Sequence, residues 1–198
     1  MKKILLSIAF LIFIFPTASH AMDVHTVQEG DSLWEISLKY KIGLKEIIDA
    51  NSQFENPDLI YPGQKVNVPN IDAIKKVEQE VIRLTNVKRE EQGLAPLASN
   101  WELSRVARDK SVDMHENNYF SHTSPKHGSP FDMIKSYGIS YDTAGENIAK
   151  GQQSPAEVVE AWWNSEGHKK NMINPAFTEI GVGFSEAGNC WTQMFIGK

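Results

Sequence analysis

The chain has 198 residues but only one cysteine, Cys190, and no run of basic residues. A single cysteine excludes an internal disulfide, so the fold must depend on a packed hydrophobic core, unlike most small secreted folds. Without a basic run, and with a formal net charge of −5, nucleic acid is not expected as a partner. The G-x-S-x-G elbow of serine hydrolases is absent too, which removes one common route to catalysis.

Long apolar runs are scarce as well, and the one near the N-terminus stands out. Residues 4–15 are apolar, Lys2 and Lys3 precede them, and residues 19–21 have the small-x-small form of a cleavage site. This pattern predicts a secretory signal peptide over residues 1–21. The apolar run is shorter than the ~20 residues that a membrane span needs, and an uncleaved anchor is the alternative. We expect a secreted protein that begins near Met22, has no membrane partner after cleavage and carries a net charge of −7 once Lys2 and Lys3 are removed.

Residues 24–69 have the pattern of a small separate domain. A strand candidate over residues 24–27 is followed by a capping box, in which Ser32 starts a helix three residues before Glu35. A second short helix is predicted over residues 44–50, and residues 65–68 alternate like a strand after a Pro-Gly turn. The predicted order is therefore strand, helix, helix, strand.

This segment resembles a LysM domain. The resemblance depends on V-x-x-G-D-S-L-W-x-I at residues 27–36 and L-I-Y-P-G-Q-K-V-x-V-P at residues 59–69. It implies binding to N-acetylglucosamine polymers, most often peptidoglycan, in a groove between two loops. The glycan-binding candidates that it implies are Gly30, Asp31, Ser32, Leu33, Asn56, Pro57, Asp58, Leu59, Ile60 and Tyr61. A helix-start charge is the alternative role for Asp31, and core packing is the alternative for Leu59 and Tyr61.

Residues 73–198 are long enough for a second domain with its own core. Apolar residues three or four apart from Ile74 to Val87 predict an amphipathic helix that ends before Gly93. Three more helices are predicted: one opened by a capping box at Ser99, one over residues 130–137 and one opened by a capping box at Ser154. Residues 180–184 and 190–196 predict a β-hairpin.

Four polar residues of this second domain are candidates for a site: His122, Glu146, Glu166 and His168. They come from three segments that are poor helix candidates and that can converge. Glu166 and His168 are two positions apart, a spacing that points in different directions on a helix. Because glycine tolerates unusual backbone angles, we expect Gly167 to break the helix and let both side chains face one cavity.

Residues 77–198 resemble a CAP domain, the family of cysteine-rich secretory, antigen 5 and pathogenesis-related proteins. The motifs are L-T-N-x-x-R (84–89), F-S-H-x-S-P (120–125), A-G-E-N-I-A-x-G (144–151), W-W-N-S-x-G-H-x-x-N (162–171), I-G-V-G (180–183) and W-T-Q-x-F (191–195). They are most similar to the secreted and sporulation-associated Bacillus-type branch. The resemblance implies an α–β–α sandwich, so the whole chain is expected to be α+β, a βααβ LysM domain followed by a CAP domain.

The CAP resemblance also implies a cleft with a His–Glu–Glu–His tetrad as candidate catalytic residues. His122, Glu146 and His168 match its motifs, and Glu166 is the fourth candidate, with a surface position as the alternative. Two imidazoles in one cleft suit a divalent metal such as zinc, held by His122 and His168 with water completing the site. A glutamate would orient a histidine or move a proton. A purely structural His–Glu network is the alternative.

Two classes of function follow from these patterns. In the first, the LysM domain binds peptidoglycan and the CAP cleft binds a ligand or a divalent metal, in the cell wall or a spore envelope. In the second, the protein is a metal-assisted hydrolase that acts on the wall or on peptides. Paired Glu146 and Glu166 would suit glycoside hydrolysis only at a separation of ~5–5.5 Å or ~6.5–9.5 Å between their carboxyl groups. Because nucleophile motifs are missing, the sequence favours binding over catalysis.

Overall fold

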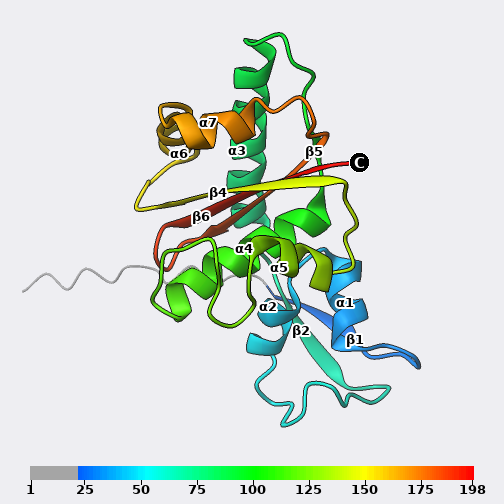
Figure 1. Ribbon diagram of the computed structural model, residues 1–198. Coiled ribbons are helices and arrows are strands. Elements are labelled where there is room, and N and C mark those ends of the chain that lie inside the picture. The colour runs from blue at the N-terminus through cyan, green and yellow to red at the C-terminus, as the bar shows by residue number, and fades with distance from the viewer. Residues whose placement is uncertain (1–21) are drawn as a thin grey trace, which may run out of the picture.

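Two units follow one another along the chain in the computed structural model (Figure 1). The structure describes residues 22–198, so the signal peptide predicted over residues 1–21 lies outside the described residues. Within residues 22–198, no helix combines the length and the apolar character that a membrane crossing requires.

The first unit has the predicted βααβ order. Its elements are β1 (Met22–Thr26), α1 (Leu33–Tyr40), α2 (Leu44–Asp49) and β2 (Lys65–Pro69), and the two strands pair antiparallel. The capping box at the start of α1 is complete: Glu35 N donates to Ser32 Oγ, and the Ser32 backbone N–H donates to the Glu35 carboxylate. These two bonds satisfy the backbone N–H groups of Ser32 and Glu35 at the helix start, as the motif predicts.

A buried asparagine joins α2 to β2. Asn51 Nδ2 donates to the carbonyls of Ile47 and Asn67, both at 2.7 Å, and Asn51 Oδ1 accepts from Asn67 N at 2.7 Å. Apolar side chains surround this link, with Ile47 and Val66 fully buried. The small unit thus has a core of its own beside a satisfied polar clamp.

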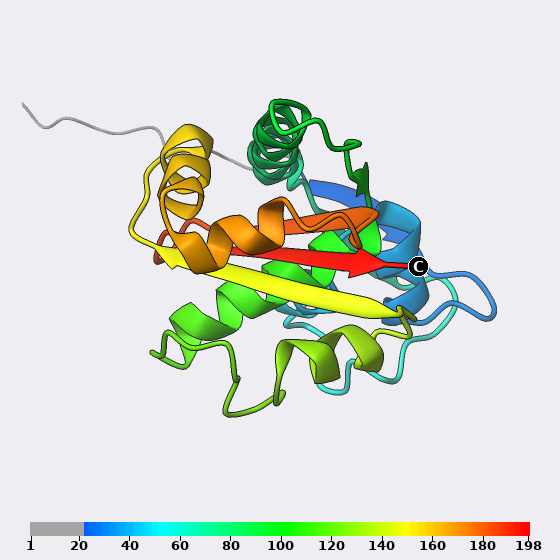
Figure 2. The same cartoon turned by 45° about the horizontal axis from the view of Figure 1, so that its top comes forward.

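The second unit is an α–β–α sandwich (Figure 2). Its helices are α3 (Asp72–Glu90), α4 (Trp101–Glu116), α5 (Pro130–Ser136), α6 (Pro155–Trp163) and α7 (Glu166–Met172), and its strands are β3 (Ala98–Ser99), β4 (Thr143–Lys150), β5 (Glu179–Ser185) and β6 (Cys190–Gly197). The sheet order is β3-β5-β6-β4, parallel between β3 and β5 and antiparallel elsewhere. Helices α4 and α5 cover one face of the sheet, and α3, α6 and α7 cover the other. The predicted fold class is confirmed.

Three local details differ from the sequence-based predictions. The start of α4 is capped by Asn100, whose side chain accepts from Leu103 N at 3.0 Å, so the predicted capping box at Ser99 is wrong. Ser99 is unsuitable because it belongs to β3 and pairs with β5. At α6, Ser154 caps the helix as predicted, but Glu157 accepts from Gln153 N, so only half of that box forms. Thr143–Lys150, a segment that is a poor helix candidate, forms strand β4, which the sequence does not predict.

The two units are in contact through α1 and α2 on one side and α4 and α5 on the other (Figure 1). The guanidinium carbon of Arg105 lies 4.4 Å from the ring centroid of Trp34 and 4.8 Å from that of Tyr137. An ion pair at 3.5 Å joins Arg108 to Glu46. Cation–π stacking and ion pairing therefore cross the junction between the units.

Candidate functional site

The side chain of His122 is fixed to a carboxylate from the central sheet. His122 lies in the segment between α4 and α5, and its Nδ1 is 2.7 Å from Glu146 Oε1. The backbone of His122 is fixed by α4, because the Nζ of the buried Lys110 donates to His122 O at 2.8 Å. Lys110 also contacts Tyr119 OH at 3.0 Å. This lysine gives the His122 segment a defined position over the sheet.

Glu146 comes from β4, where it lies opposite Met194 of β6. Its side chain is only 2% exposed, and Oε2 is buried without a hydrogen-bond partner among residues 22–198. Burial raises the pKa of Glu146, partly offset by the hydrogen bond from His122 and by the charge of Lys110. In turn, the hydrogen bond to Glu146 raises the pKa of His122.

His168 is brought to the same region by a pair of amides. Asn147 Nδ2 donates to His168 O at 3.1 Å, and Asn171 Nδ2 donates to Asn147 Oδ1 at 2.9 Å and to Glu146 O at 3.1 Å. These bonds tie α7 directly to β4. They explain why a short helix with one buried residue keeps a fixed place against the sheet.

The ring of His168 is partly buried, and its Nδ1 has no hydrogen-bond partner in the described part of the chain. Burial lowers the pKa of His168, and the positive charge of the nearby His122 lowers it further. His122 and Glu146 are therefore bonded to each other, and His168 lies near enough for the charge of His122 to act on it. In the His122 ring, Nε2 is not bonded to Glu146. In the His168 ring, Nδ1 has no hydrogen-bond partner among residues 22–198.

Glu166 is placed outside this group. It is the first residue of α7, its side chain is 86% exposed, and its carboxylate pairs with Lys170 at 2.8 Å. The expectation that Gly167 breaks the helix is wrong, since Gly167 lies inside α7. The break comes earlier, at Asn164, where α6 ends. Residues two apart on α7 point in different directions, so Glu166 and His168 do not share a face.

For the divalent metal that two histidines in one cleft would suit, the candidate donors are the imidazoles of His122 and His168. The described residues contain no group of three or more His, Cys, Asp and Glu side chains arranged to hold a metal ion. The unpartnered Nδ1 of His168 and the bond between Glu146 and His122 still fit an open site, in which a carboxylate orients one ligand and solvent completes the shell. His122 and His168 would be its protein ligands.

The two predicted glycan loops lie at the same end of the first unit (Figure 1). Val27 N donates to Gln64 O at 2.9 Å, and Gly63 N donates to Val27 O at 2.8 Å. These backbone bonds keep the chain leaving β1 beside the chain entering β2. Gly30 has a φ of +89°, which glycine adopts without strain, so the first loop can turn sharply there.

Most of the first loop supports the fold. Asp31 accepts from His25 Nε2 and from Gln28 N, both at 2.8 Å, and these bonds lower its pKa. Ser32 caps α1, and Leu33 is 3% exposed within the core. Asp31 therefore stabilises its own loop, although through His25 and not through the helix start, and Leu33 has no free side-chain surface.

The second loop offers more surface to a ligand. Leu59 is 52% exposed and Tyr61 is 57% exposed, while Ile60 turns inward and packs against the core. Asn56 Oδ1 accepts from Asp58 N at 3.0 Å and shapes the turn, in which Pro57 is half-buried. The alternative of core packing for Leu59 and Tyr61 is wrong, because both side chains face solvent.

Lys110 supports the site although none of the family motifs contains it. A signal was present, because Lys110 shares a helix face with the apolar Ala107 and Met114 at spacings of three and four. A lysine on a buried face needs hydrogen-bond acceptors, here a carbonyl and a phenol. Its presence could have indicated that the neighbouring segment folds over α4.

Two family profiles match this sequence. The CAP profile, described as the cysteine-rich secretory protein family, matches residues 82–196, which is more than half of the chain. The chain belongs to the CAP family. The LysM profile matches residues 25–69, so a LysM domain precedes the CAP domain, as the motifs predicted.

Individual relatives are similar over one or other domain. Uncharacterized protein YkwD of Bacillus subtilis strain 168 is 61% identical over 126 residues, which cover 64% of this chain and 49% of that protein. SpoIVD-associated factor A of the same organism is 51% identical over 49 residues, 25% of this chain and 13% of that protein. The crystal structure of an extracellular protein with an SCP domain from Bacillus anthracis str. Ames has a TM-score of 0.61 at 38% identity, and covers 69% of this chain and 47% of that one. The chain thus spans about half or less of these relatives.

Proposed function

We propose that this is a secreted, wall-associated protein that binds peptidoglycan through its LysM domain and presents the His122–Glu146–His168 site to a ligand or a divalent metal. The LysM part of the proposal is supported mainly by the exposed Leu59 and Tyr61 beside two loops that are fixed to each other. Apolar side chains can cover sugar faces while loop amides and carbonyls bond to N-acetyl groups.

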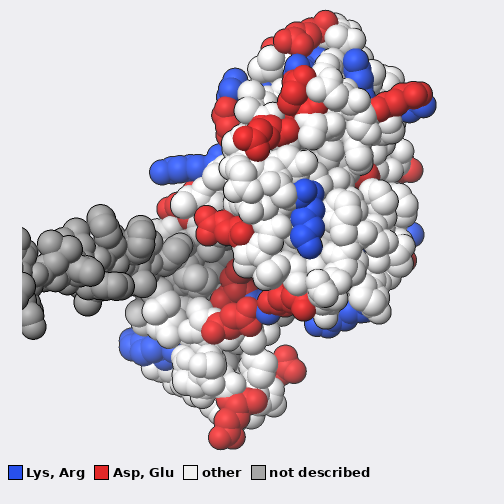
Figure 3. Space-filling model, turned by 90° about the vertical axis from the view of Figure 1, so that its left-hand side faces the viewer, with Lys and Arg blue, Asp and Glu red and all other residues white. Residues whose placement is uncertain are grey.

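The charge of the protein is compatible with this mode of binding. On the face drawn in Figure 3, acidic and basic side chains are scattered and form no continuous basic patch. Hydrogen bonds and sugar contacts do not require positive charge. An acidic protein can therefore bind a glycan within an anionic wall.

Sedimentation with insoluble peptidoglycan tests the LysM part. The chain from Met22 should sediment with the wall, and chito-oligosaccharides should release it. Leu59→Ser combined with Tyr61→Ser should leave most of the protein in the supernatant. Phe131→Ser is the matched control, because Phe131 is a 42% exposed aromatic on the CAP domain. Equal sedimentation of the double variant and the control would count against the proposed groove.

The CAP part is supported by two polar atoms that lack partners in the described residues, His168 Nδ1 and Glu146 Oε2. Buried polar atoms normally have partners, so a site with two open ones is suited to receive a ligand or ion. With zinc, His122 and His168 would be the ligands and Glu146 would hold the ring of His122.

Calorimetric titration of the chain from Met22 with zinc tests this part. We expect micromolar binding that is lost in His122→Ala combined with His168→Ala. His115→Ala is the matched control, since His115 is an exposed histidine of α4. If the double variant and the control release the same heat as the parent, the site does not bind zinc.

Metal-assisted hydrolysis is the alternative for the same three residues, and it would use Glu146 as the proton carrier. A two-carboxylate glycosidase scheme is disfavoured because Glu166 is exposed and paired with Lys170. Incubating the protein with peptidoglycan, with and without zinc, should release no fragments. If the parent protein releases fragments and Glu146→Gln does not, the function is hydrolysis and not binding alone.

The compartment is part of the same proposal, and the sporulation link depends on the Bacillus-type motifs and on SpoIVD-associated factor A as a LysM relative. We propose the vegetative wall or the spore envelope as the location. Fractionation of growing and sporulating cells with an antibody against the protein distinguishes the two. Recovery only in the cytosolic fraction would contradict both.

A further inference from the structure

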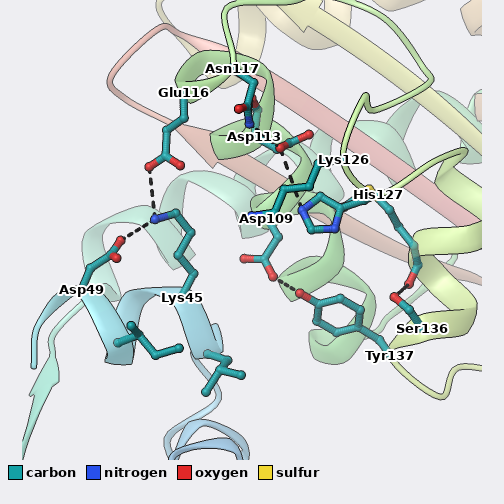
Figure 4. A pocket seen from close by; sticks show the side chains of 13 residues that line it. Lys45, Asp49, Asp109, Asp113, Glu116, Asn117, Lys126, His127, Ser136 and Tyr137 are labelled. Atoms are coloured by element: carbon teal, nitrogen blue, oxygen red, sulfur yellow. Dashed lines mark hydrogen bonds and ion pairs between the residues drawn. The ribbon is translucent and has the colours of Figure 1, made fainter. Parts of the chain in front are cut away.

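A cavity of about 360 Å³ lies at the junction of the LysM and CAP domains (Figure 4). Helix α2 of the LysM domain forms one wall, α4 and α5 of the CAP domain form the opposite wall, and residues 126–127 close one side. Its size is within the range of small-molecule sites, which often occur between domains. It is separate from the glycan loops and from the His122–Glu146–His168 group, none of whose residues line it.

The walls combine apolar surface with rim charges that neutralise one another. Leu44 and Ile48 from α2 face Met133 from α5. At the rim, Lys45 bridges the two units by pairing with Asp49 at 2.8 Å and with Glu116 at 3.2 Å. These two acids therefore carry little free charge toward a ligand.

Asp113, deeper in the cavity, is also fully engaged. It accepts from Asn117 Nδ2 at 2.7 Å and from Ser124 Oγ at 2.7 Å, and it forms a further hydrogen bond with the hydroxyl of Tyr119. His127 lies 3.9 Å away on the same side. Asp113 holds the fold of the loop and is not free to bind a ligand.

Asp109 differs from these three acids. Its carboxylate lines the cavity and bonds through Oδ2 to the hydroxyl of Tyr137, while Oδ1 lies on the side of Gly43 and Glu46, 3.1 Å from where a Cβ at Gly43 would stand (Figure 4). Glu46 of α2 is near enough for its charge to act on Asp109; its oxygens have no hydrogen-bond partner among residues 22–198, and its one ion pair in that part of the chain is with Arg108, at 3.5 Å. Two neighbouring carboxylates thus lie at the junction, and neither has a full set of hydrogen bonds.

The two arginines near Asp109 are engaged with other groups. Arg108 forms two hydrogen bonds with Glu78, at 2.8 and 2.6 Å, and Arg105 is stacked on aromatic rings. Burial, and next the charge of Glu46, raise the pKa of Asp109 to about 7, against the opposing effects of Tyr137, Arg108 and Arg105. The titratable and charged groups around Asp109 are Lys45, Glu46, Asp49, Arg105, Arg108, Asp113, Glu116, Lys126, His127 and Tyr137.

We propose that the junction cavity binds the primary ammonium group of an aliphatic amine, with Asp109 as its acceptor and Leu44, Ile48 and Met133 around its chain. At roughly 30 Å³ per water-sized group, the cavity has room for about a dozen non-hydrogen atoms, the size of an acetylated lysine. An amine on a wall peptide and a free polyamine share this chemistry. The proposal goes beyond the proposed function, because neither the glycan loops nor the histidine site contributes to it.

Amine binding must depend on pH in a defined direction. A cation beside Asp109 stabilises the ionised carboxylate, so binding expels the proton that Asp109 holds at lower pH. Affinity should therefore rise as pH increases through about 7, by about tenfold between pH 6 and pH 8 for a single group with that pKa. An aliphatic ammonium stays charged over this interval.

The probe is Nα-acetyl-lysine methylamide, titrated into the chain from Met22 by calorimetry at pH 6 and pH 8. Its Nε-acetylated form is the matched ligand without charge. We expect binding of the charged probe only, about tenfold tighter at pH 8. Equal binding of the two forms, or no binding at millimolar concentration, would overturn the proposal. 1,5-Diaminopentane is the second arm: if it binds more tightly than the lysine probe, a free polyamine is the source, and the reverse order indicates a peptide.

Two variants link binding to the cavity. Asp109→Asn should abolish binding of the lysine probe, whereas Asp142→Asn, an exposed aspartate outside the cavity, should not change it. Ser136→Trp keeps every charge and places an indole in the cavity from an exposed position of α5, so it should also abolish binding, even if Asp109→Asn misfolds. Unchanged probe affinity in folded Ser136→Trp would show that the amine binds elsewhere. Peptidoglycan sedimentation should be normal in both variants, so failure here is distinguishable from failure of the proposed function.

Discussion

The imidazole of His122 and the carboxylate of Glu146 form a hydrogen-bonded pair across the boundary between solvent and core. Nδ1 lies 2.7 Å from Oε1, and the side chains are 55% and 2% exposed, respectively. When Glu146 is ionised its carboxylate only accepts, so Nδ1 then carries the proton and Nε2 of the neutral ring keeps its lone pair. The pair thus presents one oriented nitrogen on the exposed side of the His122 ring.

The pair makes a prediction about histidine titration. Because the hydrogen bond to Glu146 is the main cause that raises the pKa of His122, Glu146→Gln should lower that pKa. His168 should titrate below the usual histidine range in the parent protein, since burial lowers its pKa. Two-dimensional NMR of the ring protons across pH 4–9 measures both.

Glu166→Gln is the matched control for this titration. Glu166 is exposed and pairs with Lys170, so its loss should leave the pKa of His122 unchanged. A fall in the pKa of His122 as large as that in Glu146→Gln would mean that Glu166 reaches the cleft. An unchanged pKa in Glu146→Gln would contradict the observed hydrogen bond.

The elements that could be predicted from the sequence are those that local patterns determine. The capping box of Ser32 and Glu35, the helical spacing from Ile74 to Val87 and the turn residues between β5 and β6 each act within a few positions. Such signals carry over to the folded state because the same residues meet in any helix or hairpin.

What could not be predicted depends on distant contacts. Strand β4 contains Gly145, Glu146 and Asn147, which are poor strand formers, and it exists because it pairs along its length with β6. The same pairing buries Glu146 under His122. The motifs made both Glu146 and Glu166 site candidates. Only the pairing of β4 in the sheet shows that Glu146 is buried beside His122, whereas Glu166 is exposed.

The close approach of α4 to β5 yields a second prediction. A Cβ at Gly183 would lie 1.9 Å from Arg108 N and 2.1 Å from Ala107 C, and backbone cannot move aside as a side-chain tip can. Gly183→Ala should therefore lower the free energy of unfolding by about 3 kcal/mol, the upper range for overpacking. Urea denaturation measures it, and a loss below about 1 kcal/mol would mean that the helix shifts away at little cost.

A third prediction concerns Gly167, which was expected to break the helix and instead lies within α7. A Cβ there would meet no atom within 4 Å other than its chain neighbours and the backbone of its own helix, and its φ is not in the left-handed region. Gly167→Ala should stabilise the protein by about 0.5–1 kcal/mol, because alanine loses less backbone entropy in a helix. Thermal denaturation should show a higher midpoint, whereas destabilisation would indicate a non-helical backbone at this position.

The last prediction tests the buried pair that joins α3 to α4. Arg108 Nε and Nη2 donate to the two oxygens of Glu78, which also accepts from Phe184 N at 3.1 Å. Glu78→Leu leaves Arg108 with only Glu46, at 3.5 Å, and should cost about 3–5 kcal/mol.

Adding Arg108→Met to Glu78→Leu should recover part of that loss, since no uncompensated buried cation remains. Urea denaturation of the parent, both single variants and the double variant gives the coupling energy of the pair. We expect the double variant to be more stable than the sum of the two single losses predicts, by at least about 1 kcal/mol. Strict additivity would show that Glu78 and Arg108 stabilise the fold through their other partners, Phe184 and Glu46, and not through each other.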